Sequence, residues 1–158
     1  MDNEEEKALT FRVNSIYAVL KHIKYVPFIF ALLFACVMFK EFILILGTIA
    51  LLVLLKMIYG IAYYKLVKYV LYKDRFKVET GVFSKKIDYL ELYRVEDLSS
   101  TQPFLLRILG LEHITLYTSD VSTPQVNIIG IKKSGVINIL RKNSERMRDI
   151  KRVRVFET

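Results

Sequence analysis

The chain has 158 residues, of which 53% are hydrophobic, and a net charge of +8 from 24 basic and 16 acidic residues, which suits one small domain with an additional apolar segment. The sequence holds no RNA-binding motif of interleaved aromatic and basic residues and no zinc-finger spacing, so the basic charge points to an anionic membrane surface rather than to nucleic acid. Cys36 is the sole cysteine, His22 and His113 lie far apart, and no glycine-rich phosphate loop or nucleophile elbow occurs, so we expect no disulfide, metal site, cofactor, small-molecule substrate or enzymatic activity.

Residues 1–24 are predicted to form a cytoplasmic N-terminal segment. The first ten residues are acidic and polar, which is typical of a disordered end. From Thr10 to Lys24 the apolar residues recur near helical spacing, and Asn14 or Ser15 is placed to cap a helix. This helix either runs on into the apolar stretch that follows or lies separately in the membrane interface.

The stretch from Tyr25 to Tyr64 predicts a two-helix transmembrane hairpin, because only Lys40 and Glu41 separate its two apolar runs. The first run, 25–39, covers ~22 Å at helical rise, which is less than the roughly 30 Å of a hydrocarbon core, and flanking lysines that reach the headgroups make up part of the difference. The second run, 42–64, is long enough by itself. Neither run has a polar stripe at helical period, which disfavours a buried hairpin in a soluble protein.

Basic residues flank the hairpin on the side of both chain ends, whereas the connecting turn offers only Lys40. The flanking residues are Arg12, Lys21, Lys24, Lys65, Lys68, Lys73 and Arg75. The positive-inside rule therefore places both termini in the cytoplasm and the turn outside, with Tyr25, Tyr59, Tyr63 and Tyr64 in an aromatic belt at the cytoplasmic face. Lys56, the one charge within the second run, either snorkels to that face or marks a functional contact inside the membrane.

Residues 65–150 are predicted to form one small, mainly β domain. Residues 63–72 either continue the second helix or bend into a strand, and Lys73 to Arg75 marks a turn. Beyond it, a period of two in the apolar residues predicts short strands over 76–80, 87–92, 95–100, 112–118 and 126–131. Gly81 permits a tight turn after the first of these strands, and Pro103 ends pairing after the third. The compact apolar run from Phe104 to Leu109 predicts one helical turn that plugs the core.

A helix is predicted to close the domain. Ser134 is placed to cap it, and one face carries Val136, Ile137, Leu140 and Met147. Residues 151–158 form a basic tail with alternating basic and apolar side chains, expected either to be disordered or to be a strand that awaits a partner. Several short strands followed by one helix are typical of a small antiparallel barrel or two-sheet sandwich with a helix over one open end.

An ordered set of residues runs from Tyr72 to Thr118. It comprises Arg75, Gly81, Val95, Leu98, Gln102, Leu105, Leu106, Leu109, Gly110, Leu111, Ile114, Leu116 and Thr118. This set resembles the bacterial pleckstrin-homology-like (PH-like) domains of the YdbS type, and the apolar hairpin before it is similar to the architecture of that family. The resemblance covers about Tyr25 to Met147, and Glu112, which stands where the family usually has a second glycine, affects a local turn. It implies a fold in which a transmembrane α-helical hairpin precedes an α+β, mainly β, PH-like barrel or sandwich with a C-terminal capping helix, in a family without an assigned enzymatic activity.

We therefore expect a multi-pass protein of the bacterial inner membrane whose PH-like domain is a cytoplasmic adaptor or scaffold for a protein partner or a second copy. An alternative is recognition of anionic lipid headgroups by Lys73, Arg75, Lys77, Lys85 and Lys86. Another alternative is an accessory subunit of a transporter, channel or secretion complex, with Lys56 inside a helix interface. The candidates for binding an acidic protein partner are Arg141, Arg148, Arg152 and Arg154.

Overall fold

The structure is a computed structural model that describes residues 8–156, with side chains described for residues 8–152. The chain divides into two compact units. The helical unit is Ser15–Lys65, and the β-rich unit takes the chain up to Asn14 and again from Leu66 onward.

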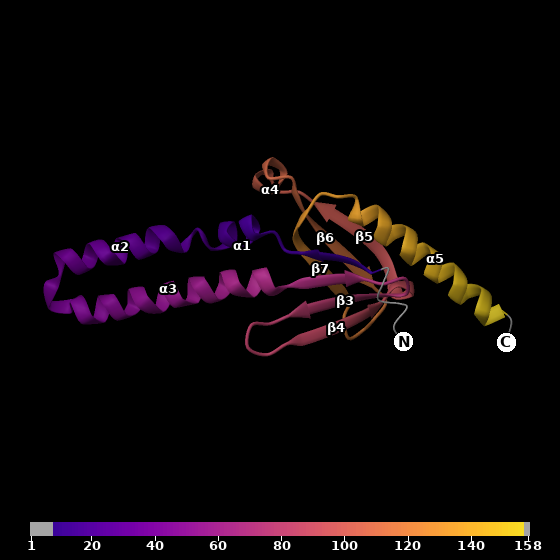
Figure 1. Ribbon diagram of the computed structural model, residues 1–158, viewed down its shortest axis with the longest axis horizontal. Helices are drawn as coiled ribbons and strands as arrows, with labels where there is room; N and C mark the ends of the chain where they lie inside the picture. Colours follow the sequence, from indigo (N-terminus) through magenta and orange to yellow (C-terminus); the bar gives the residue numbers. More distant parts are fainter. Residues whose placement is uncertain (1–7, 157–158) are drawn as a thin grey trace. The chain divides into compact units, whose positions relative to one another are not determined.

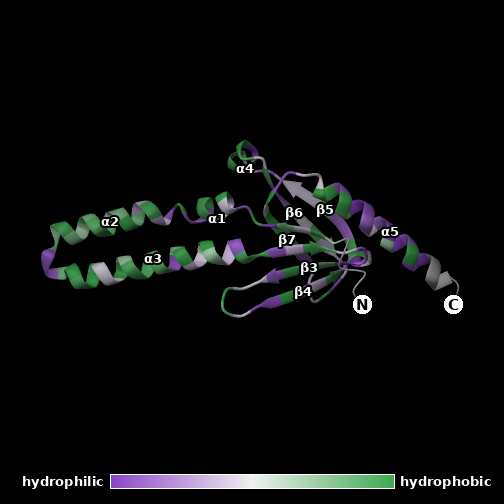
Figure 2. Ribbon diagram, viewed as in Figure 1, coloured by the Kyte–Doolittle hydropathy of each residue, from purple (hydrophilic) through white to green (hydrophobic). Residues whose placement is uncertain are grey.

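The helical unit consists of α1 (Ser15–His22), α2 (Tyr25–Met38), the 3-10 turn η2 (Lys40–Phe42) and α3 (Ile43–Leu66). From η2, α2 and α3 run in opposite directions (Figure 1), and hydrophobic residues occupy most of both helices (Figure 2). Within these fully described helices, no residue of α2 and only Ala50 of α3 is buried. In the described part of the chain, one helix, Lys40–Leu66 with η2 included, is long and apolar enough to cross a membrane. The pair α1 and α2, bent by 45° at the break between them, supplies a second candidate span only if the two helices are counted as one.

Within the helical unit, α1 packs against α3 beside Gly60. A Cβ atom at this position would overlap the imidazole of His22, so a larger residue would require that ring to move. The ring of Tyr17 meets the ring of Tyr64 edge-on, with 5.8 Å between the centroids. The helix predicted from Thr10 to Lys24 is thus present as the separate helix α1, although it begins only at Ser15.

The β-rich unit contains two antiparallel sheets. Sheet A has the order β1 (Leu9–Arg12), β2 (Lys68–Leu71), β3 (Arg75–Thr80) and β4 (Lys86–Glu91), and sheet B has the order β5 (Val95–Thr101), β6 (Leu111–Thr118) and β7 (Gln125–Lys132). The five strands predicted from the period-two pattern correspond to β3–β7, with ends that differ by at most one residue. Gly81, with φ +113°, makes the predicted turn after β3.

The core of the β-rich unit is built from residues of both sheets and the last helix. Its fully buried large side chains include Tyr69, Phe76, Leu92, Ile114, Leu116, Ile128 and Leu140. Among the described residues no strand ladder joins sheet A to sheet B, so the barrel alternative is wrong and the unit is an open two-sheet arrangement. A hydrogen bond joins the two sheets where the amide of Ile129 in β7 donates to the hydroxyl of Tyr69 in β2 (3.2 Å). Just after β1, the amide of Asn14 also donates to the carbonyl of Gly130 in β7 (2.8 Å).

The prediction of a helix that begins at Thr10 is wrong for its first residues, where the chain forms strand β1 instead. All four residues of β1 pair with β2, from Leu9 opposite Leu71 to Arg12 opposite Lys68. The ring of Phe11 stacks on Tyr69 with 5.6 Å between centroids. These partners lie nearly sixty positions later, so tertiary packing overrides the local helical pattern. The disorder predicted for residues 1–10 fails for β1, and residues 1–7 lie outside the described residues.

The helical turn predicted over 104–109 is present as α4 (Phe104–Ile108), but it does not plug the core. Leu106 is its one buried residue, whereas Phe104, Leu105 and Ile108 expose 76%, 57% and 67% of their surface. Gly110, with φ +63°, ends this helix, and its carbonyl accepts a hydrogen bond from the Lys133 amide (2.9 Å). In Figure 1, α4 projects beyond the end of sheet B.

The C-terminal helix α5 (Val136–Phe156) is confirmed, but it differs from the expectation at both ends. Gly135, with φ +70°, directly precedes it, so the predicted Ser134 cap is wrong. The helix also continues through most of the predicted tail. One physical reason lies in the 3-10 turn η3 (Leu92–Arg94), where the Lys151 ammonium rests 3.2 Å from the centre of the Tyr93 ring.

Candidate interaction surfaces

The pairing of the strands shows which strand ends and loops lie together, and it defines two ends of the β-rich unit. The connection end holds Asn14 and Leu66, the points at which the chain leaves this unit and returns to it. Because Lys68 pairs with Glu79 and Thr80 pairs with Lys86, the loop between β3 and β4 lies at the same end. The opposite, distal end holds the turn between β2 and β3, together with η3.

Sheet B shares these two ends. The bond from the Asn14 amide to Gly130 places the last residues of β7 at the connection end. Leu111, the first residue of β6, pairs with Lys132, so α4 lies there as well. Figure 1 shows α4 and the β3–β4 loop at the same end of the β-rich unit. At the distal end, the Leu92 amide donates to the carbonyl of Asp74 (2.9 Å).

The five basic residues predicted to bind lipid headgroups do not form one cluster. Lys73 and Arg75 lie at the distal end and Lys85 and Lys86 at the connection end, with Lys77 between them. The two pairs are separated by the length of β3, which is six residues or roughly 20 Å at the rise of a strand. Their assignment to lipid therefore stays a prediction, and the structure divides them into two sites.

Neighbouring carboxylates already pair with most of these five cations. Lys77 and Lys85 both bind Glu79, at 2.5 and 3.0 Å. Lys86 lies 2.9 Å from Asp88, and Arg75 lies 3.3 Å from Asp74. A headgroup at these positions has to compete with a carboxylate that is already in place.

Glu79 is the strongest of these competitors. Hydrogen bonds from Lys77 and then Lys85 lower the pKa of its carboxyl group to about 2, against the opposing effect of burial. The same contact raises the pKa of Lys77. Because the Glu79 side chain is largely shielded while Lys85 is exposed, Lys77 acts as a structural partner of Glu79 and Lys85 keeps a surface position.

Three of the four arginines predicted to bind a protein partner share one flank of α5. Arg141, Arg148 and Arg152 follow the spacing i, i+7 and i+11, which returns to nearly the same angle on a helix. Arg141 and Arg152 are exposed and Arg148 is half-buried. The side chain of Arg154 lies outside the described residues. Partner binding by this flank stays a prediction.

Lys56, the intramembrane candidate, is exposed on α3. It lies ten positions before Leu66, the last residue of α3, which is ~15 Å along the helix axis. Tyr59, about one turn further on, is also exposed. The choice between snorkelling and a functional contact stays open at this residue.

The distal end holds a network that sequence reasoning missed. The Arg94 guanidinium lies 3.3 Å from Glu91 and 3.5 Å from Asp120, and its Nε donates to the Tyr93 hydroxyl (3.1 Å). A hydrogen bond from Tyr93 and the charges of Arg94 and Lys151 lower the pKa of Glu91. The network joins the end of β4, η3, the β6–β7 loop and α5. The pairs Arg94–Asp120 and Lys151–Tyr93 are too far apart in the chain for a local sequence pattern to report.

Glu112 is a second residue whose role the sequence interpretation missed. It is buried in β6, where one carboxylate oxygen accepts a hydrogen bond from the Ser100 hydroxyl (2.9 Å) and the other has no partner among the described residues. The signal was available, because Glu112 shares the inward alternation of Ile114 and Leu116. Glu112 stands where related domains usually have a glycine, but the expected effect on a local turn is wrong, because this position lies within strand β6. The irregularity next to it is a shift in the β6–β7 register, where His113 accepts a hydrogen bond from the Gly130 amide (2.9 Å).

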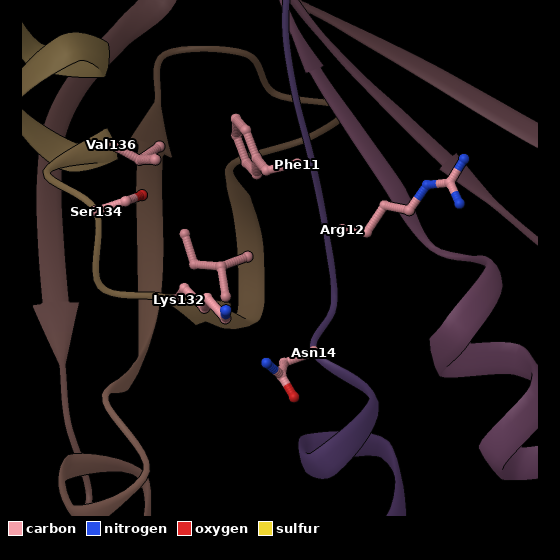
Figure 3. Close-up of a pocket in the computed structure, with 7 residues that line it drawn as sticks. Phe11, Arg12, Asn14, Lys132, Ser134 and Val136 are labelled. Carbon is pink, nitrogen blue, oxygen red and sulfur yellow. The ribbon is translucent and has the colours of Figure 1, made fainter.

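A small hollow lies at the connection end between β1, the end of β7 and the start of α5. Its volume is about 230 Å³, and it is lined by Phe11, Arg12, Asn14, Ile131, Lys132, Ser134 and Val136. In Figure 3, Phe11 faces Val136, whereas the Arg12 guanidinium points away from the other labelled side chains. The hollow is smaller than the 300–1,000 Å³ usual for ligand pockets, so its geometry does not support a small-molecule site. In the described part of the chain, no group of three or more His, Cys, Asp or Glu side chains is placed to hold a metal ion.

One family model matches the chain, and its description is "Bacterial PH domain". The match covers residues 19–147, which is more than half of the chain. It begins within α1 and thus includes α2 and α3 as well as the strands from β2 onward, but it leaves out β1. No curated protein and no solved structure is detectably similar to the chain.

Proposed function

Because the chain belongs to the bacterial PH domain family, whose domains are protein or lipid interaction modules, we propose that it is a membrane-anchored adaptor. In this proposal α2 and α3 form a transmembrane hairpin in the bacterial inner membrane, both chain ends are cytoplasmic, and the β-rich unit binds a protein partner or a second copy at the inner leaflet. Tethering raises the effective concentration at the membrane, so that weak contacts suffice.

The observation that carries the proposal is the exposure of α3. This helix has 24 residues, or ~36 Å at helical rise, which is longer than the roughly 30 Å of a hydrocarbon core. Exposed apolar residues occur along most of its length, including Leu44, Ile45, Leu51, Leu52, Leu55 and Ile58. An apolar surface of this extent is typical of a helix that lies in lipid rather than in water.

For α2, a membrane crossing depends on the residues that flank the helix. The helix has 14 residues, or ~21 Å, which is short for a crossing. Lys21 and Lys24 precede it and reach toward headgroups by snorkelling. The preceding α1 exposes Ile16 and Val19, and Ile23 directly after it lines the same apolar hollow, which suits a helix that rests in the membrane interface.

A protein partner is favoured over a specific lipid headgroup because most of the candidate lipid-binding cations are paired within the domain. Two features offer surfaces to such a partner. The arginine flank of α5 suits an acidic surface. The strand β4 lies at the edge of sheet A with Ile87 and Tyr89 exposed, which suits the addition of a strand from another chain.

Membrane extraction tests the anchoring. We expect the full chain, expressed in bacteria, to remain in the membrane pellet through an alkaline carbonate wash and to float with vesicles after reconstitution. A peripheral bacterial protein held only by charge, carried through the same wash, should be released and serves as the control. Recovery of the chain in the carbonate supernatant would overturn the proposal.

A further inference from the structure

The short helix α4 presents an apolar surface that the fold does not use. Phe104, Leu105 and Ile108, which we call the α4 tip, are mostly exposed, and Leu106 alone holds the helix to the core. Both ends of α4 are fixed. Gln102 before it donates to the Leu111 carbonyl (3.1 Å), and Gly110 after it accepts from the Lys133 amide (2.9 Å). The α4 tip is therefore a supported apolar projection rather than a loose loop.

The α4 tip lies close, along the chain, to the point where the β-rich unit joins the helical unit. Gly110 is bonded to Lys133, which is three residues, or at most about 10 Å of chain, from Gly130. Gly130 in turn is bonded to the amide of Asn14, and α1 begins at the next residue. Likewise, only Val67 separates the end of α3 from β2, a reach of about 7 Å. These short links keep the connection end near the place where α3 ends.

Basic residues stand beside the α4 tip. Arg107 belongs to α4 itself, and Lys132 and Lys133 are exposed where β7 ends. Among the described residues, no carboxylate lies within ion-pair distance of these three cations. They differ in this respect from Lys77, which is held by Glu79. Exposed apolar side chains beside uncompensated cations are typical of a surface that meets anionic lipid at the level of the headgroups.

We propose that α4 is a membrane-docking element. The α4 tip enters the boundary between headgroups and acyl chains, and Arg107, Lys132 and Lys133 meet anionic headgroups of the same leaflet. This inference rests on the proposed anchoring by α2 and α3, and it adds a second contact that fixes how the β-rich unit is held at the bilayer. Lipid is favoured over a protein partner because the short links keep this surface near the membrane exit and because its cations are available to anionic headgroups.

The absence of tryptophan from the chain makes a direct test possible. Single-tryptophan variants of the full chain are reconstituted into vesicles of phosphatidylcholine and phosphatidylglycerol that carry bromine at defined acyl positions. F104W reports on the α4 tip. V121W reports on a residue that is 96% exposed in the β6–β7 loop at the distal end, and L51W reports on α3. We expect bromines near the headgroups to quench F104W, bromines near the bilayer centre to quench L51W, and neither position to quench V121W.

The three variants separate the two proposals. Quenching of L51W without quenching of F104W would overturn the docking of α4 and leave the anchoring intact. Failure of L51W to be quenched would overturn the anchoring and, with it, the docking. A blue-shifted F104W that bromine does not quench would mean that protein covers the α4 tip, which also contradicts lipid docking.

Charge reversal provides the second measurement. In the F104W background, Arg107→Glu with Lys132→Glu and Lys133→Glu should remove more than half of the quenching in anionic vesicles. The control reverses two exposed cations of α5 that lie outside the arginine flank, Lys142 and Arg146, and should leave the quenching unchanged. Equal loss in both variants would show that the attraction is diffuse and would overturn the role given to the three cations.

Discussion

The charged network at the distal end and the surface around α4 at the connection end use charge in opposite ways. At the distal end Arg94, Glu91 and Asp120 bind one another, and Lys151 rests on Tyr93, so the charged groups hold the fold together. At the connection end Arg107 has no carboxylate beside it in the described structure, while the α4 tip is exposed. A count of basic residues along the chain does not separate these cases. The presence or absence of a carboxylate beside each cation does. Lys85 and Lys86 at the connection end are paired with carboxylates, so this difference identifies the surface around α4 as the one available to an external partner.

The largest expected effect distinguishes core from surface at the connection end. Tyr69→Ala removes a buried ring that stacks with Phe11 and Phe76, and it should lower the free energy of unfolding by about 3 kcal/mol or more. Phe104→Ala removes an exposed ring and should change it by less than about 0.5 kcal/mol. Denaturant titration in detergent measures both. A similar loss in the two variants would mean that α4 belongs to the core after all.

The next effect concerns the buried carboxylate. Ser100→Ala removes the hydroxyl that donates to Glu112 and should cost about 1–3 kcal/mol, because both oxygens of a buried side chain are then left without a partner. Adding Glu112→Leu to this variant should recover part of the loss, since no unpartnered carboxylate then remains at position 112. Thermal unfolding of the single and double variants checks this. A double variant that is less stable than Ser100→Ala would contradict it.

A smaller effect depends on pH. The folded-state pKa of Glu79 is about 2, below the usual value of 4.5, so its ion pairs stabilise the fold above about pH 5 and are lost as the pH falls toward 2. Solvent screening at Lys85 reduces the contribution to about 1–2 kcal/mol. Glu79→Gln should therefore flatten the acid limb of a plot of Tm against pH. An unchanged limb would mean that other carboxyl groups control acid unfolding.

The smallest expected effect lies at the distal end. Lys151→Ala removes the ammonium from the face of Tyr93 and should cost about 0.5–1 kcal/mol, the range for an exposed cation–π contact. Lys142→Ala, an exposed change on the same helix, is the matched control and should be neutral. Hydrogen exchange of residues 148–156 measures the result, and equal protection in both variants would remove Lys151 from the account of why α5 is long.

Features with a local cause could be predicted from the sequence, and those with distant partners could not. The alternation that carries Ile114 and Leu116 fixes a buried strand face whatever surrounds it, and both residues are buried. The strand β1 depends on Tyr69, far along the chain, and local spacing suggested a helix instead. The run over 104–109 was correctly predicted to be helical, but which of its apolar residues are buried depends on packing against strands elsewhere in the chain. The candidate cations could be identified from the sequence. Their carboxylate partners became apparent only from the folded structure.

The most direct test of the account is the accessibility of the turn between α2 and α3. On a Cys36→Ser background, which removes the one native thiol, cysteine is placed at Glu41 in η2 or at Asp120 in the β6–β7 loop. In intact cells an impermeant thiol reagent should label Glu41→Cys and should spare Asp120→Cys until the cells are lysed. Labelling of Asp120→Cys in intact cells, or protection of Glu41→Cys under the same conditions, would contradict a hairpin that crosses the membrane and holds the PH-like domain in the cytoplasm.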